Sequence, residues 1–414
     1  MLKKIIMATF LLIGKSFIRL TEYLESHNHN FIVLVDSANN FSSKADTTYA
    51  CDFSSIDNVI ETAHKIDRLH NINGVIAIYE NYVLPAAQIA KALKLPGLTI
   101  ESAEACTDKE IMRNKFAAAP EKISPDFKLV SNKNDLIEFA NQHQFPLILK
   151  PTNLVKSLLV TKANSMDQLV ANYELTLGHI DEVYKKYAPN RQPKLLVEEF
   201  IHGSIHSVDA FIDKNGKVMV LDQVVDYETG QEIGFDDNFH YSRLLPSNLN
   251  QTDIDKIRHV AELGCRALGM TNSPAHIEII LSPDGPRVVE IGARNGGYRE
   301  RMHDFANGID IVGSALAIAL GKEPDIKALR NDYCTVLEIF PKEEGIFVDI
   351  ENDDKIRKLS TLVYYMKKVK TGALVGKASD GFKACAVIIL HSTDENQFNE
   401  DSNYIRNNVS VKIA

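Results

Sequence analysis

The chain has 414 residues, enough for roughly two or three domains with sizeable cores. Its hydrophobic content of 45% and charged content of 24% are those of an ordinary globular protein and exclude a disordered chain. The net charge of -9 argues against a general nucleic-acid-binding protein, because phosphate binding needs a basic excess. A small anionic substrate stays compatible with this charge, since a local cluster of Lys and Arg can bind it.

The five cysteines are odd in number and far apart in the sequence. Because no pair has metal-ligand spacing, we expect free and mostly buried thiols in a reducing cytoplasm. The N-terminus imitates a signal peptide, with Lys3 and Lys4 before an apolar run. Lys15 ends that run early, however, and no small-x-small cleavage site follows. A buried parallel strand has the same composition, so we predict a first strand and no membrane span.

Residues 1–100 alternate apolar runs with amphipathic stretches, which predicts an α/β domain with a parallel sheet. The expected strands are Lys4–Leu12, Asn30–Val35, Gly74–Ile78 and Leu98–Ile100. Helical spacing occupies Ser16–Ser26, Ile56–Leu69 and Leu84–Leu93. No G-x-G-x-x-G follows the first strand, so the sequence lacks the dinucleotide-binding fingerprint.

The pattern changes at about residue 101, where helices precede a series of strands. Expected helices are Asp108–Ala119, Lys133–Gln142, Asp253–Leu268 and Asp354–Leu359. Expected strands are Phe145–Lys150, Lys194–Phe200, Ser207–Ile212, Lys217–Val224, His276–Leu281, Arg287–Ile291, Tyr333–Phe340 and Lys383–His391. We therefore divide the remainder into residues 101–330, with a lid over roughly 125–200 and a core over 201–330, and a C-terminal α+β segment, 331–414.

Three segments carry side chains suited to a nucleotide site. Lys150 ends an apolar strand, where a lysine can hold phosphate oxygens as a point charge, and Lys109 lies in DKEIMRNKF. Alone, each is more often a solvated surface lysine. The run LLVEEFIHG suits an interdomain hinge whose backbone reads adenine, although an amphipathic edge strand would have the same pattern.

The segment HIEIILSPDGPRVVEIGARNGG predicts a hairpin with one glutamate on each strand. A two-residue Asp284-Gly285 loop would put Glu278 and Glu290 on opposite faces. A three-residue loop, Pro283–Gly285, sets them directly opposite, and Pro and Gly suit its turn positions; five residues would give the same register.

Two carboxylates with Cβ atoms roughly 5 Å apart repel each other unless a cation lies between them. Mg²⁺ bound by a couple of carboxylates and nucleotide phosphates is the natural cation. Arg294, in the glycine-bracketed GARNGG turn, is placed to reach charge on a transferring phosphoryl group. The competing interpretation is a structural ion-pair network on a sheet face.

With these motifs in order, the sequence resembles the ATP-grasp superfamily over nearly its full length. The ordered set is an α/β pre-domain, then DKEIMR, ILKP, VEEF-I-H-G, HIE and VEIGARNGG. The EIGARNGG form and IYENYVLPAAQIAKALKLPG look most like the branch of L-amino acid ligases and other carboxylate-amine ligases. The resemblance implies an ATP-grasp architecture: a parallel α/β pre-domain, two α+β subdomains that clasp ATP, and a small C-terminal subdomain.

The resemblance also implies an activity and roles for individual residues. A carboxylate would attack the γ-phosphate of ATP, and an amine would attack the resulting acyl phosphate, with the protein supplying position and charge. Arg294 would steady the acyl phosphate, and Glu278 and Glu290 would bind Mg²⁺ or Mn²⁺. ATP would be held by Lys109, Lys150, Ser157, Glu198, Glu199, Phe200, Ile201 and His206.

Two departures from the family pattern concern ATP. The loop after ILKP reads TNLVKSLLV and has no glycine, so only Ser157 matches the usual Gly- and Ser-rich phosphate loop. Where the family often has a ribose-binding glutamate, this sequence has Ile205, and His206 and Asp209 are two candidate replacements.

The expected substrates are small carboxylates and amines, and a homodimer is compatible with the sequence. Glu80, at a strand end, would meet a substrate ammonium group, and His240 and Arg243 lie in a segment where amino-acid ligases place substrate contacts. Each residue also fits an ordinary exposed loop. Two further hypotheses stay open: another ATP-grasp ligase, of carboxylase or peptide-tailoring type, and a nucleotide-binding regulator without turnover.

Overall fold

A computed structural model describes residues 7–14, 18–37, 47–154, 158–188, 191–237 and 239–414. The N-terminal sheet is parallel, in the order β3-β2-β1-β4. Its strands are β1 Thr9–Ile13, β2 Asn30–Asp36, β3 Thr48–Cys51 and β4 Gly74–Ala77. Strand β1 is buried on both faces, as the N-terminal apolar run predicts for a central parallel strand.

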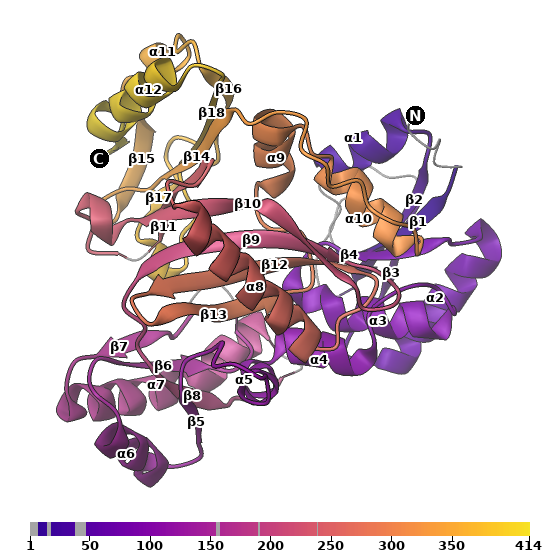
Figure 1. Cartoon of the computed structure of the whole chain (residues 1–414), viewed down its shortest axis with the longest axis horizontal. Coiled ribbons are helices and arrows are strands. Elements are labelled where there is room, and N and C mark those ends of the chain that lie inside the picture. Colours follow the sequence, from indigo (N-terminus) through magenta and orange to yellow (C-terminus); the bar gives the residue numbers. More distant parts are fainter. Residues whose placement is uncertain (1–6, 15–17, 38–46, 155–157, 189–190, 238) are drawn as a thin grey trace.

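Helices cover both faces of this sheet. One face packs against α2 (Ile56–His70) and α3 (Val83–Ala92). The other packs against α1 (Ile18–Ser26) and α10 (Ile311–Ala319), a helix from much later in the chain. Figure 1 shows α10 beside the indigo N-terminal strands. The N-terminal sheet is therefore completed by a segment outside residues 1–100.

Helices α4 (Ile100–Thr107) and α5 (Lys109–Ala117) lead into a small antiparallel unit, which we call the lid. Its sheet has the order β5-β8-β6-β7. Its elements are β5 Phe127–Val130, α6 Lys133–Gln142, β6 Leu147–Pro151, β7 Thr161–Ala163, α7 Met166–Tyr187 and β8 Leu195–Glu199. These bounds lie within the lid predicted at roughly 125–200.

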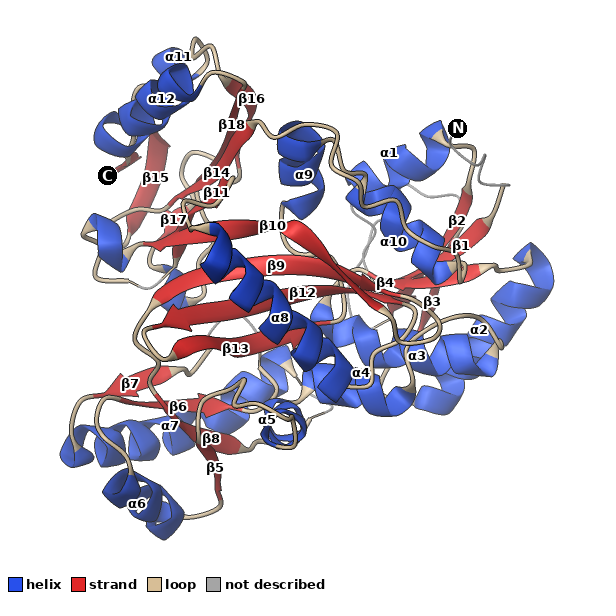
Figure 2. Cartoon of the chain, in the orientation of Figure 1, coloured by secondary structure: helices blue, strands red, loops and turns tan. Residues whose placement is uncertain are grey.

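The centre of the molecule is an antiparallel sheet of eight strands, in the order β13-β12-β9-β10-β11-β14-β18-β16. Helix α8 (Gln251–Ala267) crosses one face and forms the largest part of the core with it (Figure 2). The strands are β9 Ser204–Ile212, β10 Val218–Thr229, β11 His240–Leu245, β12 Ser273–Ser282, β13 Gly285–Gly292, β14 Tyr333–Ile339, β16 Leu362–Lys367 and β18 Ala386–Ser392.

This sheet crosses the predicted boundary at residue 330, since β14, β18 and β16 lie beyond it. The C-terminal segment adds a three-stranded sheet, β17-β15-β19, and two helices. Their bounds are β15 Gly345–Ile350, α11 Asp353–Ile356, β17 Leu374–Val375, α12 Glu395–Asn408 and β19 Val411–Ile413. Short 3-10 turns, η1 to η3, occupy Glu80–Tyr82, Gln231–Ile233 and Ala378–Asp380.

Several expected elements differ from the observed ones. The strand predicted at Leu98–Ile100 is wrong, because Ile100 begins α4 and the Thr99 hydroxyl caps it by accepting from the Ser102 N–H. The expected first strand begins at Thr9 in the described residues, and residues 1–6 lie outside them. The prediction missed several further elements, namely β3, β5, β7, β11, β15, β16, β17, β19, α4, α7, α9 (Arg299–Asn307), α10 and α12. Over the described part of the chain, no helix is long and apolar enough to cross a membrane.

Candidate active site

The β12–β13 hairpin brings Glu278 and Glu290 opposite each other, as one of the two sequence registers predicts. The reason differs from the expected one. The loop consists of Pro283 and Asp284 only, because Ser282 already pairs with Gly285. A bulge between the Glu278 and Ile279 pairs then shifts the register by one residue and moves Glu290 to the face of Glu278.

The bulge is held by two hydrogen bonds from outside the hairpin. The Val288 N–H donates to the Ile123 carbonyl at 2.6 Å. The Nη2 of Arg113, on α5, donates to the Val289 carbonyl at 2.8 Å. Because the bulge decides which face Glu290 occupies, the segment that joins the N-terminal domain to the lid also sets the carboxylate geometry.

Alternation along β9 and β12 separates two faces of the central sheet. Val208, Ala210, Ile277 and Ile279 pack on the α8 side. Glu278 pairs with Ser207, and His276 pairs with Asp209, so these side chains share the other face. The side chains of Glu278 and Glu290 are 32% and 26% exposed, which leaves both accessible to a ligand.

Two cations and a third carboxylate complete what we call the charged cluster: Glu80, Lys109, Glu278, Glu290 and Arg294. The Nζ of Lys109 lies 3.0 Å from Glu290 Oε2, and the Nε of Arg294 donates to Glu80 Oε2 at 3.0 Å. Glu80 stands in η1, directly after the carboxyl end of β4, where α/β sheets place their ligands. The structure thus gathers residues separated by up to 214 positions into one site.

The Arg294 loop approaches Glu80 closely. A Cβ atom on Gly292 would lie 2.9 Å from Glu80 Oε2, so a side chain there would displace the carboxylate. The second oxygen of Glu80, Oε1, is buried without a hydrogen-bond partner among the described residues. A buried carboxylate oxygen without a partner is costly, and a donor from a bound ligand would satisfy it.

Burial is the main cause that raises the pKa of Glu80 from 4.5 to about 7, against the opposing charge of Arg294. Because the carboxyl ionises less readily in the folded protein, the folded state loses stability as pH rises from about 4.5 to about 7. Above that window the loss of stability is complete. Glu80→Gln should therefore be nearly neutral at pH 5 and stabilise the free protein by up to about 3 kcal/mol at pH 8. Urea unfolding at the two pH values measures this difference. An equal effect at both would show that Glu80 does not titrate in that window.

Lys150 does not stand free in the lid. Its Nζ lies 2.6 Å from Glu198 Oε2, and Arg113 Nε donates to the other Glu198 oxygen at 2.9 Å. Burial, the largest influence, lowers the pKa of Lys150 to about 8, although Glu198 opposes the shift. The Glu198 side chain therefore holds two cations in place, and a nucleotide contact there would come from the backbone of its strand.

The remaining residues predicted to bind ATP lie around the end of β8. Glu199 Oε2 accepts from the Asp126 N–H at 3.3 Å, and the ring of Phe200 lies 4.0 Å below the Lys162 ammonium. Ile201 follows in the loop to β9 and is partly buried. Ser157 lies outside the described residues, as do residues 155 and 156 of the glycine-free loop that should close over the phosphates.

His206 is placed away from the charged cluster. It pairs with Ile279, which belongs to the α8 face, and its Nδ1 contacts Asp226 Oδ1 at 2.8 Å. The alternative residue, Asp209, faces the cluster side and contacts His276 at 2.9 Å. Strand alternation therefore separates the two candidates that the sequence could not distinguish.

His240 and Arg243 lie on the cluster side of the sheet, beyond β10. The ring of His240 packs on Tyr227 at 4.3 Å, and Arg243 Nη2 lies 2.9 Å from Glu338 Oε2. Burial lowers the pKa of His240 to about 4, although Glu278 opposes it, so His240 is neutral at pH 7. These aromatic and charged groups form a wall next to Glu278. They belong to the central sheet, not to the lid or the N-terminal domain.

The donors of the cluster fit a divalent cation only with help from a ligand. No three His, Cys, Asp or Glu side chains converge as a metal site in the described chain. Glu278 and Glu290 alone would supply two carboxylates, the number that Mg²⁺ commonly takes from protein when phosphates provide the rest. The donor set therefore fits Mg²⁺ or Mn²⁺ bound together with a nucleotide.

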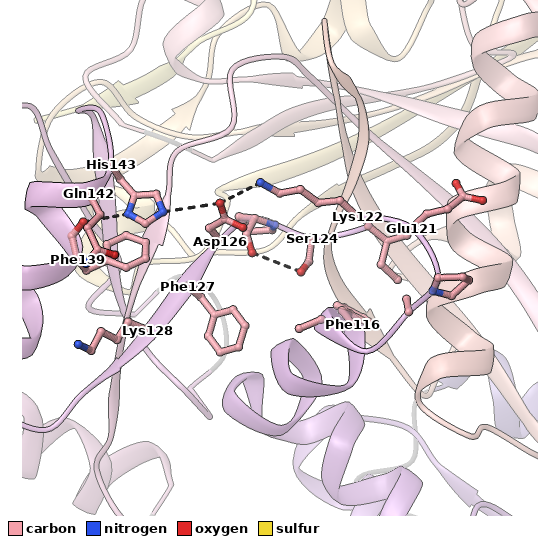
Figure 3. Close-up of a pocket in the computed structure, with 15 residues that line it drawn as sticks. Phe116, Glu121, Lys122, Ser124, Asp126, Phe127, Lys128, Phe139, Gln142 and His143 are labelled. Atoms are coloured by element: carbon pink, nitrogen blue, oxygen red, sulfur yellow. Dashed lines mark hydrogen bonds and ion pairs between the residues drawn. The ribbon is translucent and has the colours of Figure 1, made fainter.

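A cavity of about 550 Å³ lies elsewhere, where α5 joins the lid (Figure 3). Phe116, Phe127 and Phe139 form its apolar wall, and Asp126 binds Lys122 at 3.0 Å beside it. Its lining residues fall within 116–143, so the charged cluster does not contribute to it. We therefore build the candidate active site on the cluster and not on this cavity.

Sequence reasoning missed three charged residues that support the cluster: Arg113, His276 and Arg299. All three are buried. Lys, Arg and Asp are rarely buried without partners, but the partners here come from strands and helices far away in the sequence. The signal present in the sequence was the alternation that places Ser207, Asp209, His276 and Glu278 on one face.

Comparison with known proteins gives an independent result. The model of the ATP-grasp domain matches residues 143–300, which contain Lys150, Glu198, Glu278, Glu290 and Arg294. An uncharacterized protein of Sinorhizobium fredii, y4rH, is 22% identical over 80% of this chain and 66% of its own length. An alanine–anticapsin ligase of Bacillus amyloliquefaciens is 24% identical over 84% of this chain and 79% of that protein.

The fold also matches a solved structure over its whole length. An L-amino acid ligase from Bacillus licheniformis superposes with a TM-score of 0.82, covering 98% of this chain and 99% of that one. Sequence identity between the two is 18%, so the match concerns the fold. The three-part arrangement of N-terminal sheet, lid and central sheet is thus shared with that solved structure, and the match to the ATP-grasp domain falls within it.

Proposed function

Because this chain contains an ATP-grasp domain within an ATP-grasp fold, we propose that it is an ATP- and Mg²⁺-dependent carboxylate-amine ligase acting on amino acids. The observation that carries the proposal is the charged cluster, in which Glu278 and Glu290 stand opposite each other beside Arg294 and Glu80. The buried Glu80 oxygen that has no partner among the described residues would be satisfied by a donor from a bound amino acid.

In this proposal the nucleotide lies between the lid and the central sheet. Lys109 and Lys150 hold its phosphates, and the β8 end, residues 198–201, holds the adenine. Glu278 and Glu290 bind Mg²⁺, which supplies charge neutralisation at the phosphates. Since Lys109 contacts Glu290 in the structure, metal binding would free this lysine for the phosphates.

Two substrates would meet at the other end of the cluster. The free oxygen of Glu80 accepts a hydrogen bond from the ammonium group of an amino acid, whose carboxylate then lies beside Arg294. A carboxylate oxygen attacks the γ-phosphorus, the bond to the bridging oxygen breaks, and ADP leaves. The amine of the second substrate attacks the acyl carbon and loses a proton, and phosphate departs with one of the carboxylate oxygens. His240 and Arg243 would line the site of this second substrate.

The cellular location follows from the same chemistry. All five cysteines are buried and free. Buried free thiols are typical of a reducing compartment, where ATP is also abundant, and this supports a cytoplasmic enzyme.

The proposal is tested by ADP formation across a panel of amino acids, added singly and in pairs, with bicarbonate and short peptides alongside. Dependence on a pair of amino acids is the expected result. Dependence on bicarbonate or on a peptide would instead support another ATP-grasp ligase. Absence of ADP formation with every addition, while ATP still binds, would support a nucleotide-binding regulator and reject the ligase.

A further inference from the structure

His276 joins Glu278 to a second carboxylate on the neighbouring strand. Its Nδ1 donates to Asp209 Oδ1 at 2.9 Å, and its Nε2 lies at ion-pair distance, 3.7 Å, from Glu278 Oε1 and 3.5 Å from the Tyr227 hydroxyl. The two contacts follow from strand geometry, since Glu278 is two residues along β12 and Asp209 is the cross-strand partner on β9. One oxygen of Glu278 is thereby directed toward the imidazole.

The second oxygen of Asp209 lies near two side chains of α9. Arg299 Nε and His303 Nε2, both on α9, lie 3.3 Å and 3.6 Å from its Oδ2. Both of these side chains are fully buried. Arg299 also donates to the Ser207 hydroxyl at 2.8 Å and to the Tyr227 hydroxyl at 2.6 Å. The contacts of Arg299 and His303 with Asp209 are ion-pair contacts without hydrogen-bond geometry. Among the described residues, the direct hydrogen bond of Asp209 is therefore the one from His276.

The His276 ring also supports the loop that carries Arg294. A Cβ atom on Gly296 would lie 2.4 Å from His276 Nδ1, so the backbone of the loop rests directly on the imidazole. Only glycine allows this approach. One side chain thus borders both the carboxylate Glu278 and the turn after Arg294.

We propose that His276, held by Asp209, is a positioning residue that fixes the Glu278 carboxylate for the divalent cation. The inference rests on the proposed function, in which Glu278 is a metal ligand. Carboxylates that bind metals are themselves oriented by hydrogen-bonding partners, and removing such a partner commonly weakens metal binding about 10–100-fold. His276 does not contact the substrate in this assignment and acts on the cation through Glu278.

Two substitutions of His276 separate its two contacts. His276→Asn keeps an amide near the Nδ1 position, facing Asp209, and loses the contact with Glu278. His276→Gln places its amide near the Nε2 position, facing Glu278. Mn²⁺ binding, followed by electron paramagnetic resonance with a non-hydrolysable ATP analogue present, should weaken about tenfold in His276→Asn and less in His276→Gln. ATP affinity in EDTA should match wild type in both.

The controls distinguish the inference from the proposed metal site. Glu278→Gln should lose Mn²⁺ binding, and Asp209→Asn should behave as His276→Asn does. If His276→Asn binds Mn²⁺ as wild type while Glu278→Gln does not, the positioning role is rejected and the metal site stands. If Glu278→Gln binds Mn²⁺ as wild type, the proposed metal site itself is rejected. Thermal unfolding identifies any variant that fails to fold, and Asp209→Asn then decides the case in place of His276→Asn.

Discussion

Arg294→Ala should lower turnover by about 10²–10³-fold and leave ATP affinity nearly unchanged. In the proposed reaction Arg294 faces charge that develops as the γ-phosphoryl group moves, and such contacts affect rate more than binding. Lys150→Ala should do the opposite and raise the dissociation constant of ATP about tenfold, because Lys150 faces phosphates already present in the ground state. Calorimetry measures binding, and phosphate release measures turnover.

The contact between Arg294 and Glu80 requires two controls. Removing the arginine leaves the buried Glu80 carboxylate without its counter-ion, so the double variant Glu80→Gln/Arg294→Ala separates this effect from the loss of catalytic charge. Arg287→Ala, on strand β13 just before the Arg294 loop but outside the charged cluster, should leave both quantities unchanged. The division of roles is wrong if Arg294→Ala loses ATP affinity as Lys150→Ala does while turnover at saturating ATP is retained.

Glu290→Gln should abolish most of the magnesium-dependent stabilisation by ATP. A ligand that binds only the native state stabilises it by mass action, by about 2.7 kcal/mol at roughly a hundred times the dissociation constant. The variant loses one of two proposed metal ligands but keeps its shape, and Lys109 loses its partner and stays available for phosphate. ATP in EDTA should therefore still stabilise Glu290→Gln as it stabilises wild type.

Thermal unfolding with ATP, with and without Mg²⁺, measures the magnesium-dependent and the magnesium-independent stabilisation. Glu262→Gln on α8 is the matched control, because Glu262 binds Arg266 on the surface, remote from the cluster. It should show the wild-type response. A full magnesium-dependent shift in Glu290→Gln would remove this residue from the metal site, and no shift with nucleotide in wild type would count against the whole assignment.

Much of the fold follows from local patterns in the sequence. The N-terminal alternation predicts β2, α2, β4 and α3 close to their observed bounds, because strand and helix periods are strong there. Helix α7 was missed although Leu169, Tyr173, Thr176, Ile180 and Tyr184 form a buried helical stripe. The signal was present, but a central Gly178 and two exposed leucines, Leu175 and Leu177, dilute it.

The pairing of the two hairpin glutamates was predicted correctly, but the loop expected to produce it was not. Turn residues indicated a three-residue loop, whereas the structure combines a two-residue loop with a bulge held by Arg113 and Ile123. Both give the same pairing of Glu278 with Glu290. Contacts of a bulge with distant segments cannot be read from the local sequence. The predicted and observed pairings agree only because both arrangements leave the same number of residues unpaired between the two glutamates.

The site beyond the hairpin depends on strand order. His276 meets Asp209 only because β9 lies between β12 and β10, an order that does not follow the chain. Arg299 reaches Asp209 from α9, and Glu80 reaches Arg294 from η1. The sequence supplied the types of residue and the resemblance supplied their roles, but only the assembled sheets bring the buried partners together.

The central claim is that a carboxylate is activated as an acyl phosphate. Its most direct test uses an amino acid labelled with ¹⁸O in the carboxylate, paired with the amine that gives the fastest ADP formation. We expect one ¹⁸O atom in each phosphate released, in equal number to the amide bonds formed. Unlabelled phosphate, or formation of AMP and pyrophosphate, would contradict the account.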